Sequence, residues 1–211
     1  MMTTNGAIYI VDDDDAVRAS LKVLLETHDF TVTCFQDGAD FLRAVTSLPM
    51  GCILLDLRLP DIDGLSVQRK LIEMEVHLPV IIMTGYGDVP LAVAAMRMHA
   101  VDFLEKPVGV ERLLAAVERA LALAAEQHDA AAREQRARSM LDNLTPREAQ
   151  VFLQLIQGHP NKVVGRVLDL SPRTVEVHRK HIYEKLVAKS LADLVRIAIA
   201  AGIDPSEGEA S

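Results

Sequence analysis

Several kinds of residue are scarce in this chain, and their scarcity limits the classes of protein to which it can belong. The 211 residues include no tryptophan, only 4% aromatic residues and two cysteines. Cys34 and Cys52 lie far apart in apolar runs without a metal-ligand spacing, so we expect reduced core thiols. Half of the residues are hydrophobic, so aliphatic side chains must fill any core.

Long hydrophobic runs are also missing. No apolar segment reaches the roughly 18 residues that a membrane-spanning helix needs. Residues 1–11 contain no basic region followed by a long apolar stretch, which is the pattern of an export signal. We therefore expect a cytoplasmic protein with no membrane partner.

Acidic residues are in excess, but they are unevenly distributed. The formal net charge is −8, which taken alone argues against a nucleic-acid partner. Residues 1–122 contain 10 Lys and Arg against 18 Asp and Glu, whereas residues 144–204 contain 9 against 6. An acidic half followed by a mildly basic half predicts two domains with different partners.

Short β-rich runs alternate with amphipathic helical stretches in the first half of the chain. The apolar runs cover residues 7–11, 31–35, 52–55, 80–83 and 103–104. Nearly continuous apolar strands separated by helices are typical of a parallel sheet covered on both faces. Residues 1–122 are therefore predicted to form a doubly wound, flavodoxin-like α/β domain with five parallel strands.

The second half is predicted to be entirely helical. Residues 110–143 have the composition of one long helix, whose part 123–143 we interpret as a linker, either a coiled-coil seam or a solvated connector. Cap signals at Thr145, Ser171 and Ser190 predict a four-helix domain over 144–204. The first of these is a capping box with Pro146 and Glu148. A disordered tail is expected over 205–211.

Chemically active side chains follow the predicted strands at one edge of the sheet. Ligands of open parallel sheets bind outside the carboxyl ends of the strands. The residues at those ends are Asp12, Asp13, Asp56, Thr84 and Lys106. Two carboxylates about 5 Å apart repel by roughly 3 kcal/mol at an effective dielectric constant near 20. Because one lysine cannot neutralise three acids, this edge is predicted to bind a hard divalent cation, Mg²⁺ or Mn²⁺.

Such a site would support phosphoryl transfer to a carboxylate. The cation, the Thr84 hydroxyl and the Lys106 ammonium would hold a phosphoryl group while Asp56 attacks phosphorus. The product would be an aspartyl phosphate.

Four motifs in the first half resemble the signature of response-regulator receiver domains. They are VDD at 11–13, LDLRLPDIDG at 55–64, MTG at 83–85 and EKP at 105–107. The resemblance implies that Asp56 accepts a phosphoryl group from a sensor histidine kinase. It also implies that Asp13, Asp56 and the backbone carbonyl of Arg58 coordinate Mg²⁺, with Asp12 acting through water. Thr84 and Phe103 would change position together after phosphorylation.

Two positions depart from the receiver pattern. His99 stands where receivers usually have glycine before the switch aromatic, so the preceding helix needs another C-cap and the turn is expected to be altered. Val108 replaces an aromatic residue that is common after Lys-Pro, which affects packing rather than phosphoryl chemistry.

The second half has the proportions of a helix-turn-helix, with helices over 161–168 and from 172 to about 187. On the second helix a buried stripe is expected at Val175, His178, Ile182 and Leu186. The opposite face is cationic and suits a DNA major groove, although by itself it is equally compatible with plain solvation. Its residues are Arg173, Thr174, Val177, Arg179, Lys180 and His181.

Several segments of this half resemble the LuxR-type helix-turn-helix, and one of them, together with residues 189–191, is particularly similar to FixJ-like regulators. The LuxR-type segments are LTPRE at 144–148, Gly158, NK at 161–162, SPRTVEVHR at 171–179 and KL at 185–186. The similarity to FixJ-like regulators lies in residues 171–179 and in KSL at 189–191. The resemblance implies binding to double-stranded DNA, with Glu176, Val177 and Lys180 facing base edges. The DNA backbone would be contacted by Thr174, Arg179, Asn161 and Lys162, and Arg173 belongs to the same surface. Gly165 replaces an alanine that is common in the scaffold helix.

Together these features predict a two-component transcription regulator that catalyses only its own phosphorylation and dephosphorylation. Phosphorylation is expected to release the DNA-binding domain, favour homodimers and regulate transcription with RNA polymerase, most commonly as an activator. A phosphatase with an aspartyl intermediate would need a second aspartate where Arg58 stands. A phosphate-independent DNA binder is disfavoured because all five site residues are retained.

Overall fold

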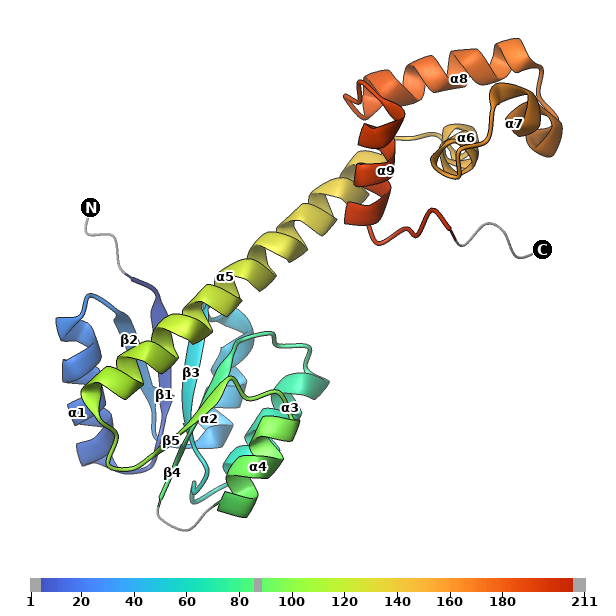
Figure 1. The fold of residues 1–211 in the computed structure, drawn as a ribbon. Helices are drawn as coiled ribbons and strands as arrows, with labels where there is room; N and C mark the ends of the chain where they lie inside the picture. The colour runs from blue at the N-terminus through green and yellow to red at the C-terminus, as the bar shows by residue number, and fades with distance from the viewer. Residues whose placement is uncertain (1–4, 86–88, 207–211) are drawn as a thin grey trace. The chain divides into compact units, whose positions relative to one another are not determined.

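Five parallel strands form the sheet of the first domain. The computed structural model describes residues 5–85 and 89–206, without the side chains of 89–92. The strands lie in the order β2-β1-β3-β4-β5, and every neighbouring pair is parallel. Their bounds are β1 Ala7–Val11, β2 Thr31–Phe35, β3 Gly51–Asp56, β4 Val80–Thr84 and β5 Asp102–Glu105. The predicted doubly wound fold is confirmed (Figure 1), with Asp56 and Thr84 as the last residues of their strands rather than the first beyond them.

Helices cover both faces of the sheet because alternate strand residues point to opposite sides. On one side, α1 (Asp15–Thr27) and the first half of α5 (Val110–Leu141) bury Ile10 and Leu54. On the other, α2 (Gly38–Ala44), a 3₁₀ turn (Val45–Ser47), α3 (Gly64–Glu73) and α4 (Val89–Arg97) pack on Tyr9 and Ile53. The two helical layers are visible on either side of the strands in Figure 1.

Both cysteines are free, as expected from the sequence. Cys52 lies in the core, and burial raises the pKa of its thiol to about 12. Cys34 is only partly buried and packs against the edge of the same core.

Four helices and the end of α5 form the second compact unit. The contacts divide the chain into Met1–His128 and Asp129–Ser211, so the boundary lies inside α5. The helices are α6 Pro146–Ile156, α7 Asn161–Leu168, α8 Pro172–Lys185 and α9 Leu191–Ala200. Their core contains Phe152, Val175, Ile182 and Leu194. The domain limits 1–122, 123–143 and 144–204 stay predictions, and of the predicted tail 205–211 only residues 205 and 206 are described.

The predicted cap residues begin three of these helices. Thr145 forms a reciprocal capping box with Glu148, and Ser171 accepts a hydrogen bond from the backbone N–H of Thr174. Ser190 forms a second capping box, with Asp193. Each cap satisfies backbone donors that have no partner within the helix.

The turn after α4 keeps its left-handed form although it lacks glycine. His99 has a φ of 67°, and the backbone N–H of Ala100 donates to the carbonyl of Ala95 at 3.1 Å. The expectation that His99 alters this turn is therefore wrong.

In the other unit, a residue other than glycine also has a left-handed backbone conformation. Val187 after α8 has a φ of 51° and is 81% exposed. A β-branched residue in this region is strained by about 1–2 kcal/mol.

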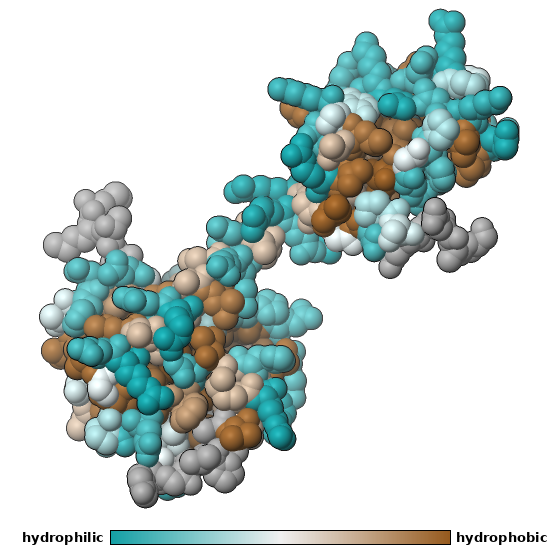
Figure 2. All heavy atoms as spheres, viewed as in Figure 1, coloured by the Kyte–Doolittle hydropathy of each residue, from teal (hydrophilic) through white to brown (hydrophobic). Residues whose placement is uncertain are grey.

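The visible surface of each unit mixes hydrophilic and hydrophobic residues, and neither is uniformly apolar in the view of Figure 2. Among the described residues, no helix combines the length and the apolar character needed to cross a membrane.

Gly165 is explained by a close approach between α7 and the turn that follows it. A Cβ atom at this position would lie 2.6 Å from the backbone oxygen of Leu170. The turn includes Asp169, which has a left-handed φ of 54°. A side chain at residue 165 would therefore force the two helices of the helix-turn-helix apart.

We expect Gly165→Ala to destabilise the second unit by about 1–3 kcal/mol, because the clash with backbone outweighs the gain of about 1 kcal/mol in helix propensity. Urea unfolding followed by circular dichroism measures the change. Arg166→Ala, an exposed position on the same helix, is the control and should shift stability by less than about 0.5 kcal/mol. If Gly165→Ala instead raises the stability of the second unit, the turn accommodates the added methyl group and the predicted clash is refuted.

Candidate phosphorylation and metal site

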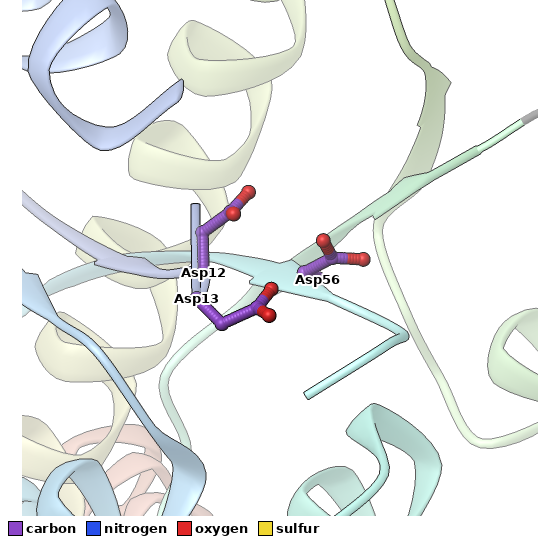
Figure 3. A group of neighbouring side chains, drawn as sticks. All are labelled: Asp12, Asp13 and Asp56. Carbon is purple, nitrogen blue, oxygen red and sulfur yellow. The ribbon is translucent and has the colours of Figure 1, made fainter. Parts of the chain in front are cut away.

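Three carboxylates meet at the carboxyl edge of the sheet, as the sequence predicts. Oxygen atoms of Asp12, Asp13 and Asp56 all lie within 4.8 Å of one another. Figure 3 shows them at the ends of the adjacent strands β1 and β3, with the Asp13 side chain extending toward Asp56. Asp12 and Asp56 are buried, whereas Asp13 is exposed. The cluster is therefore open to solvent at Asp13.

Lys106 connects two of these carboxylates. Its Nζ donates to Asp12 Oδ2 at 2.7 Å and to Asp56 Oδ2 at 2.5 Å. Burial by itself would lower the pKa of Lys106, but the hydrogen bonds to Asp12 and Asp56 outweigh it and hold the pKa above its ordinary value. The ammonium group is thus held in its charged form beside the predicted phosphoacceptor.

The loop after β3 is shaped around Asp56. The backbone N–H of Arg58 donates to Asp56 Oδ1 at 3.0 Å. At Gly64, the first residue of α3, a Cβ atom would lie 2.4 Å from the backbone oxygen of Asp56. Only glycine therefore lets α3 begin this close to the site.

Thr84 lies at the end of the neighbouring strand β4. Its buried hydroxyl donates to the carbonyl of Gly85 at 3.2 Å.

The donor set fits a small, hard divalent cation. Carboxylate oxygens are the ligands that Mg²⁺ prefers, and this ion usually keeps several water molecules. The exposed Asp13 leaves room for such water, while a single lysine leaves the three acids with excess negative charge. Asp12, Asp13 and Asp56 would hold the ion.

Arg18 is a neighbour of this site that the sequence analysis missed. Its Nη1 donates to the backbone oxygen of Asp12 at 2.5 Å, and its Nη2 pairs with Asp15. Asp14 is the N-cap of α1 and Asp15 its first residue, so both act at the helix terminus. Because Arg18 binds a backbone oxygen that lies outside α1, no spacing of residues in the sequence indicates this contact.

The predicted switch residues lie on neighbouring strands. Thr84 pairs in register with Glu105 on β5, two residues beyond Phe103. Phe103 is 37% exposed, and the Arg112 guanidinium lies 6.0 Å from the centroid of its ring. The structure therefore gives Phe103 a partly outward position.

The second helix of the helix-turn-helix separates a buried stripe from an exposed face. Val175, Ile182 and Leu186 are buried, as predicted, while His178 is only partly buried. The residues that the sequence places on base edges, namely Glu176, Val177 and Lys180, are all exposed, and so is Arg173.

Two residues that are predicted to contact the DNA backbone are hydrogen-bonded to each other within the protein. Arg179 Nη1 donates to Asn161 Oδ1 at 2.7 Å, which connects α8 to the start of α7. Thr174 is partly exposed and Lys162 is exposed. The eight predicted DNA-contacting residues therefore belong to two helices that pack against each other.

Glu148 has a larger role than the capping that the sequence predicts. It is 3% exposed, and its Oε2 accepts hydrogen bonds from the backbone N–H of Thr145 at 2.8 Å and from Lys185 Nζ at 2.6 Å. The Lys185 ammonium is the main cause that lowers the pKa of Glu148 from 4.5 to about 2. This ion pair connects the start of α6 to the end of α8.

Comparison with known proteins decides the family. The response regulator receiver domain matches residues 8–118, and the LuxR family of bacterial regulatory proteins matches residues 142–198. The chain belongs to the LuxR-type response regulators. The resemblance seen in the sequence is thereby confirmed, and the regulator consists of a receiver and a DNA-binding helix-turn-helix domain.

Relatives match the regulator over nearly its whole length. The transcriptional regulatory protein FixJ of Bradyrhizobium diazoefficiens is 46% identical over 204 residues, covering 96% of this chain and 98% of FixJ. The response regulator protein TmoT of Ectopseudomonas mendocina is 41% identical and covers 93% of this chain and 90% of TmoT.

Solved structures agree with these matches. The response regulator StyR has a TM-score of 0.82 at 36% identity, covering 92% of this chain and 98% of StyR. Full-length FixJ from B. japonicum has a TM-score of 0.60 at 45% identity, covering 95% of this chain and 98% of FixJ. The regulator is thus a FixJ-like transcriptional regulator.

The carboxylate cluster predicts a defined effect on metal affinity. Asp13→Asn should weaken Mg²⁺ binding by at least about tenfold, because it removes one charged oxygen ligand. Isothermal titration calorimetry measures the affinity. Asp15→Asn removes an equal charge two residues away, at an 88% exposed side chain, and should leave the affinity within about twofold. Equal losses in both variants would point to a general charge effect.

The Glu148–Lys185 pair predicts a loss of stability in acid. The pKa of Glu148 is near 2 in the folded protein, against an ordinary value of 4.5. The contribution of the ion pair to the free energy of unfolding is therefore complete above about pH 4.5 and disappears as the pH falls toward 2. The expected loss is roughly 2–3 kcal/mol. Urea unfolding of the wild type and Glu148→Gln across this range measures it.

In Glu148→Gln the second unit should be less stable at neutral pH and should lose less stability on acidification. Glu184→Gln, an exposed acid on α8, serves as the control and should follow the wild type. Parallel pH curves for the wild type and Glu148→Gln would contradict the assignment.

Proposed function

We propose that a sensor histidine kinase phosphorylates Asp56 in the cytoplasm, and that this reaction switches DNA binding by the second domain. The observation that carries the proposal is the arrangement of Asp12, Asp13 and Asp56 within 4.8 Å, with Lys106 paired to Asp56. A carboxylate beside two other acids and a fixed ammonium group matches what phosphoryl transfer to an aspartate needs.

In the proposed reaction an oxygen of Asp56 attacks the phosphorus atom of a phosphohistidine. The new O–P bond forms as the P–N bond breaks, and the electron pair of the broken bond stays on the imidazole nitrogen, which takes up a proton from solvent. Lys106 moves its ammonium contact from the carboxylate to a phosphoryl oxygen, while the Thr84 hydroxyl donates to another. When bound, Mg²⁺ (or Mn²⁺) would neutralise the acids and the phosphoryl oxygens, with the backbone carbonyl of Arg58 as a further ligand.

The switch follows from the position of Thr84 at the end of β4. If its hydroxyl turns toward the phosphoryl group, it vacates space beside β5, which the partly exposed ring of Phe103 can fill. A phosphoryl group shifts the balance only if it binds this second arrangement better than the first. The changed face around α4 and β5 would then release the DNA-binding domain and favour homodimers.

DNA recognition is assigned to the exposed face of α8. Glu176, Val177 and Lys180 would reach base edges in the major groove, and Arg173, Thr174 and Arg179 would contact phosphates with Asn161 and Lys162 of α7. Residues 144–204 contain 9 basic and 6 acidic residues, so one domain should bind weakly. Two copies on a two-fold symmetric site would strengthen binding.

On DNA the dimer would act on RNA polymerase, and we propose activation as the outcome. The alternative of a phosphatase is not favoured, because Arg58 occupies the position at which a second acid would be needed. The relatives reported above are named as regulators. We therefore propose no reaction beyond the regulator's own phosphorylation and dephosphorylation.

Asp56→Asn tests the proposal directly. In the wild type, acetyl phosphate with Mg²⁺ should tighten binding to a DNA fragment selected from a random pool, and Asp56→Asn should abolish this response. Fluorescence anisotropy at constant salt measures the affinity. Asp40→Asn, an exposed acid on α2, should respond like the wild type. An Asp56→Asn chain that still responds to the donor would refute the mechanism.

A further inference from the structure

A buried amide ties α3 to the end of α4. Gln68 is only 2% exposed, and its Nε2 donates to the backbone carbonyls of Ala95 at 3.2 Å and Met98 at 2.9 Å. These carbonyls lie at the C-terminal end of α4, just before the left-handed turn at His99. One side chain therefore holds the end of a helix that is 27 to 30 residues away in sequence.

The same amide is only half satisfied. Within the part of the chain that the structure describes, Gln68 Oε1 is buried and has no hydrogen-bond partner. An unpaired buried acceptor is unfavourable, and it offsets much of what the two donated hydrogen bonds contribute to folding. The main effect of Gln68 is therefore on where the end of α4 lies, rather than on overall stability.

The contact lies beside an open pocket at the surface of the domain. Gln68 lines this pocket of about 300 Å³ together with Leu71, Val76, Met98 and His99. Tightly packed elements resist displacement because their side chains interdigitate. Where such a pocket interrupts the packing between α3 and the end of α4, hydrogen bonds determine the position of the helix end to a greater degree.

We propose that Gln68 is a positioning residue that anchors the C-terminal end of α4 to α3 and thereby opposes the rearrangement of α4 after Asp56 phosphorylation. The inference rests on the proposed function. Because the amide donates to α4 in the arrangement described here, it favours that arrangement over any in which α4 has moved. Removing the donors should make the phosphorylated arrangement easier to reach.

Gln68→Met in the full-length chain separates anchoring from stability. Methionine has nearly the shape of glutamine but can neither donate to α4 nor leave a strong acceptor unpaired. We expect an unchanged urea midpoint and about tenfold faster amide hydrogen exchange at residues 98–100. Beryllofluoride with Mg²⁺, a mimic of the phosphoryl group, should bind three- to tenfold more tightly.

Val67→Ala is the matched control. Val67 is the fully buried neighbour of Gln68 and packs toward Gly38 of α2. This variant should lower the urea midpoint while leaving both the exchange at residues 98–100 and the beryllofluoride affinity close to the wild type.

Unchanged exchange at residues 98–100 in Gln68→Met would overturn the anchor. Faster exchange with unchanged beryllofluoride affinity would also overturn the proposal, since the contact would then have only a structural role. If beryllofluoride fails to bind the wild type, the proposed function is refuted instead. In that case the exchange measurement alone decides whether Gln68 holds α4.

Discussion

The pairing of the Lys106 ammonium with Asp12 and Asp56 is the interaction on which the receiver depends. Parallel strands end at the same edge of a sheet, so the fold brings three carboxylates within 4.8 Å of one another. At this separation each pair repels by roughly 3 kcal/mol at an effective dielectric constant near 20. Lys106 offsets part of that repulsion, and the remainder makes the edge a place for a divalent cation and a phosphoryl group.

The geometry of the carboxylate site also determines which residues can lie next to it. Gly64 lets α3 begin against the end of β3, where Asp56 lies, and Thr84 ends the neighbouring strand beside the site. Gln68 continues this connection along α3 to the end of α4. In the second unit, Glu148 and Lys185 hold α6 to α8, so the exposed face of α8 rests on a separately stabilised core.

Much of this arrangement could be predicted from the sequence because it depends on local patterns. Apolar runs indicate the strands, and Thr145, Ser171 and Ser190 indicate helix starts, since each acts on its own backbone within three residues. The order of acids, hydroxyl and amine at strand ends then follows from the topology of a parallel sheet.

Contacts between distant segments could not be predicted in this way. Gln68 meets α4 and Lys185 meets Glu148 only after the helices pack, and neither contact has a periodic signal in the sequence. The left-handed turn at His99 was also missed, because glycine is the usual residue in this conformation and a histidine gives no local signal for it. Which residues touch DNA is still a prediction.

The most direct test is whether Asp56 itself carries the phosphoryl group. After incubation of the full-length chain with acetyl phosphate and Mg²⁺, intact-mass spectrometry should show the gain of one phosphoryl group. Reduction with borohydride should then convert residue 56, and no other aspartate, to homoserine. A chain that gains no phosphoryl group, or that is modified at another residue, would contradict the central role of this carboxylate cluster.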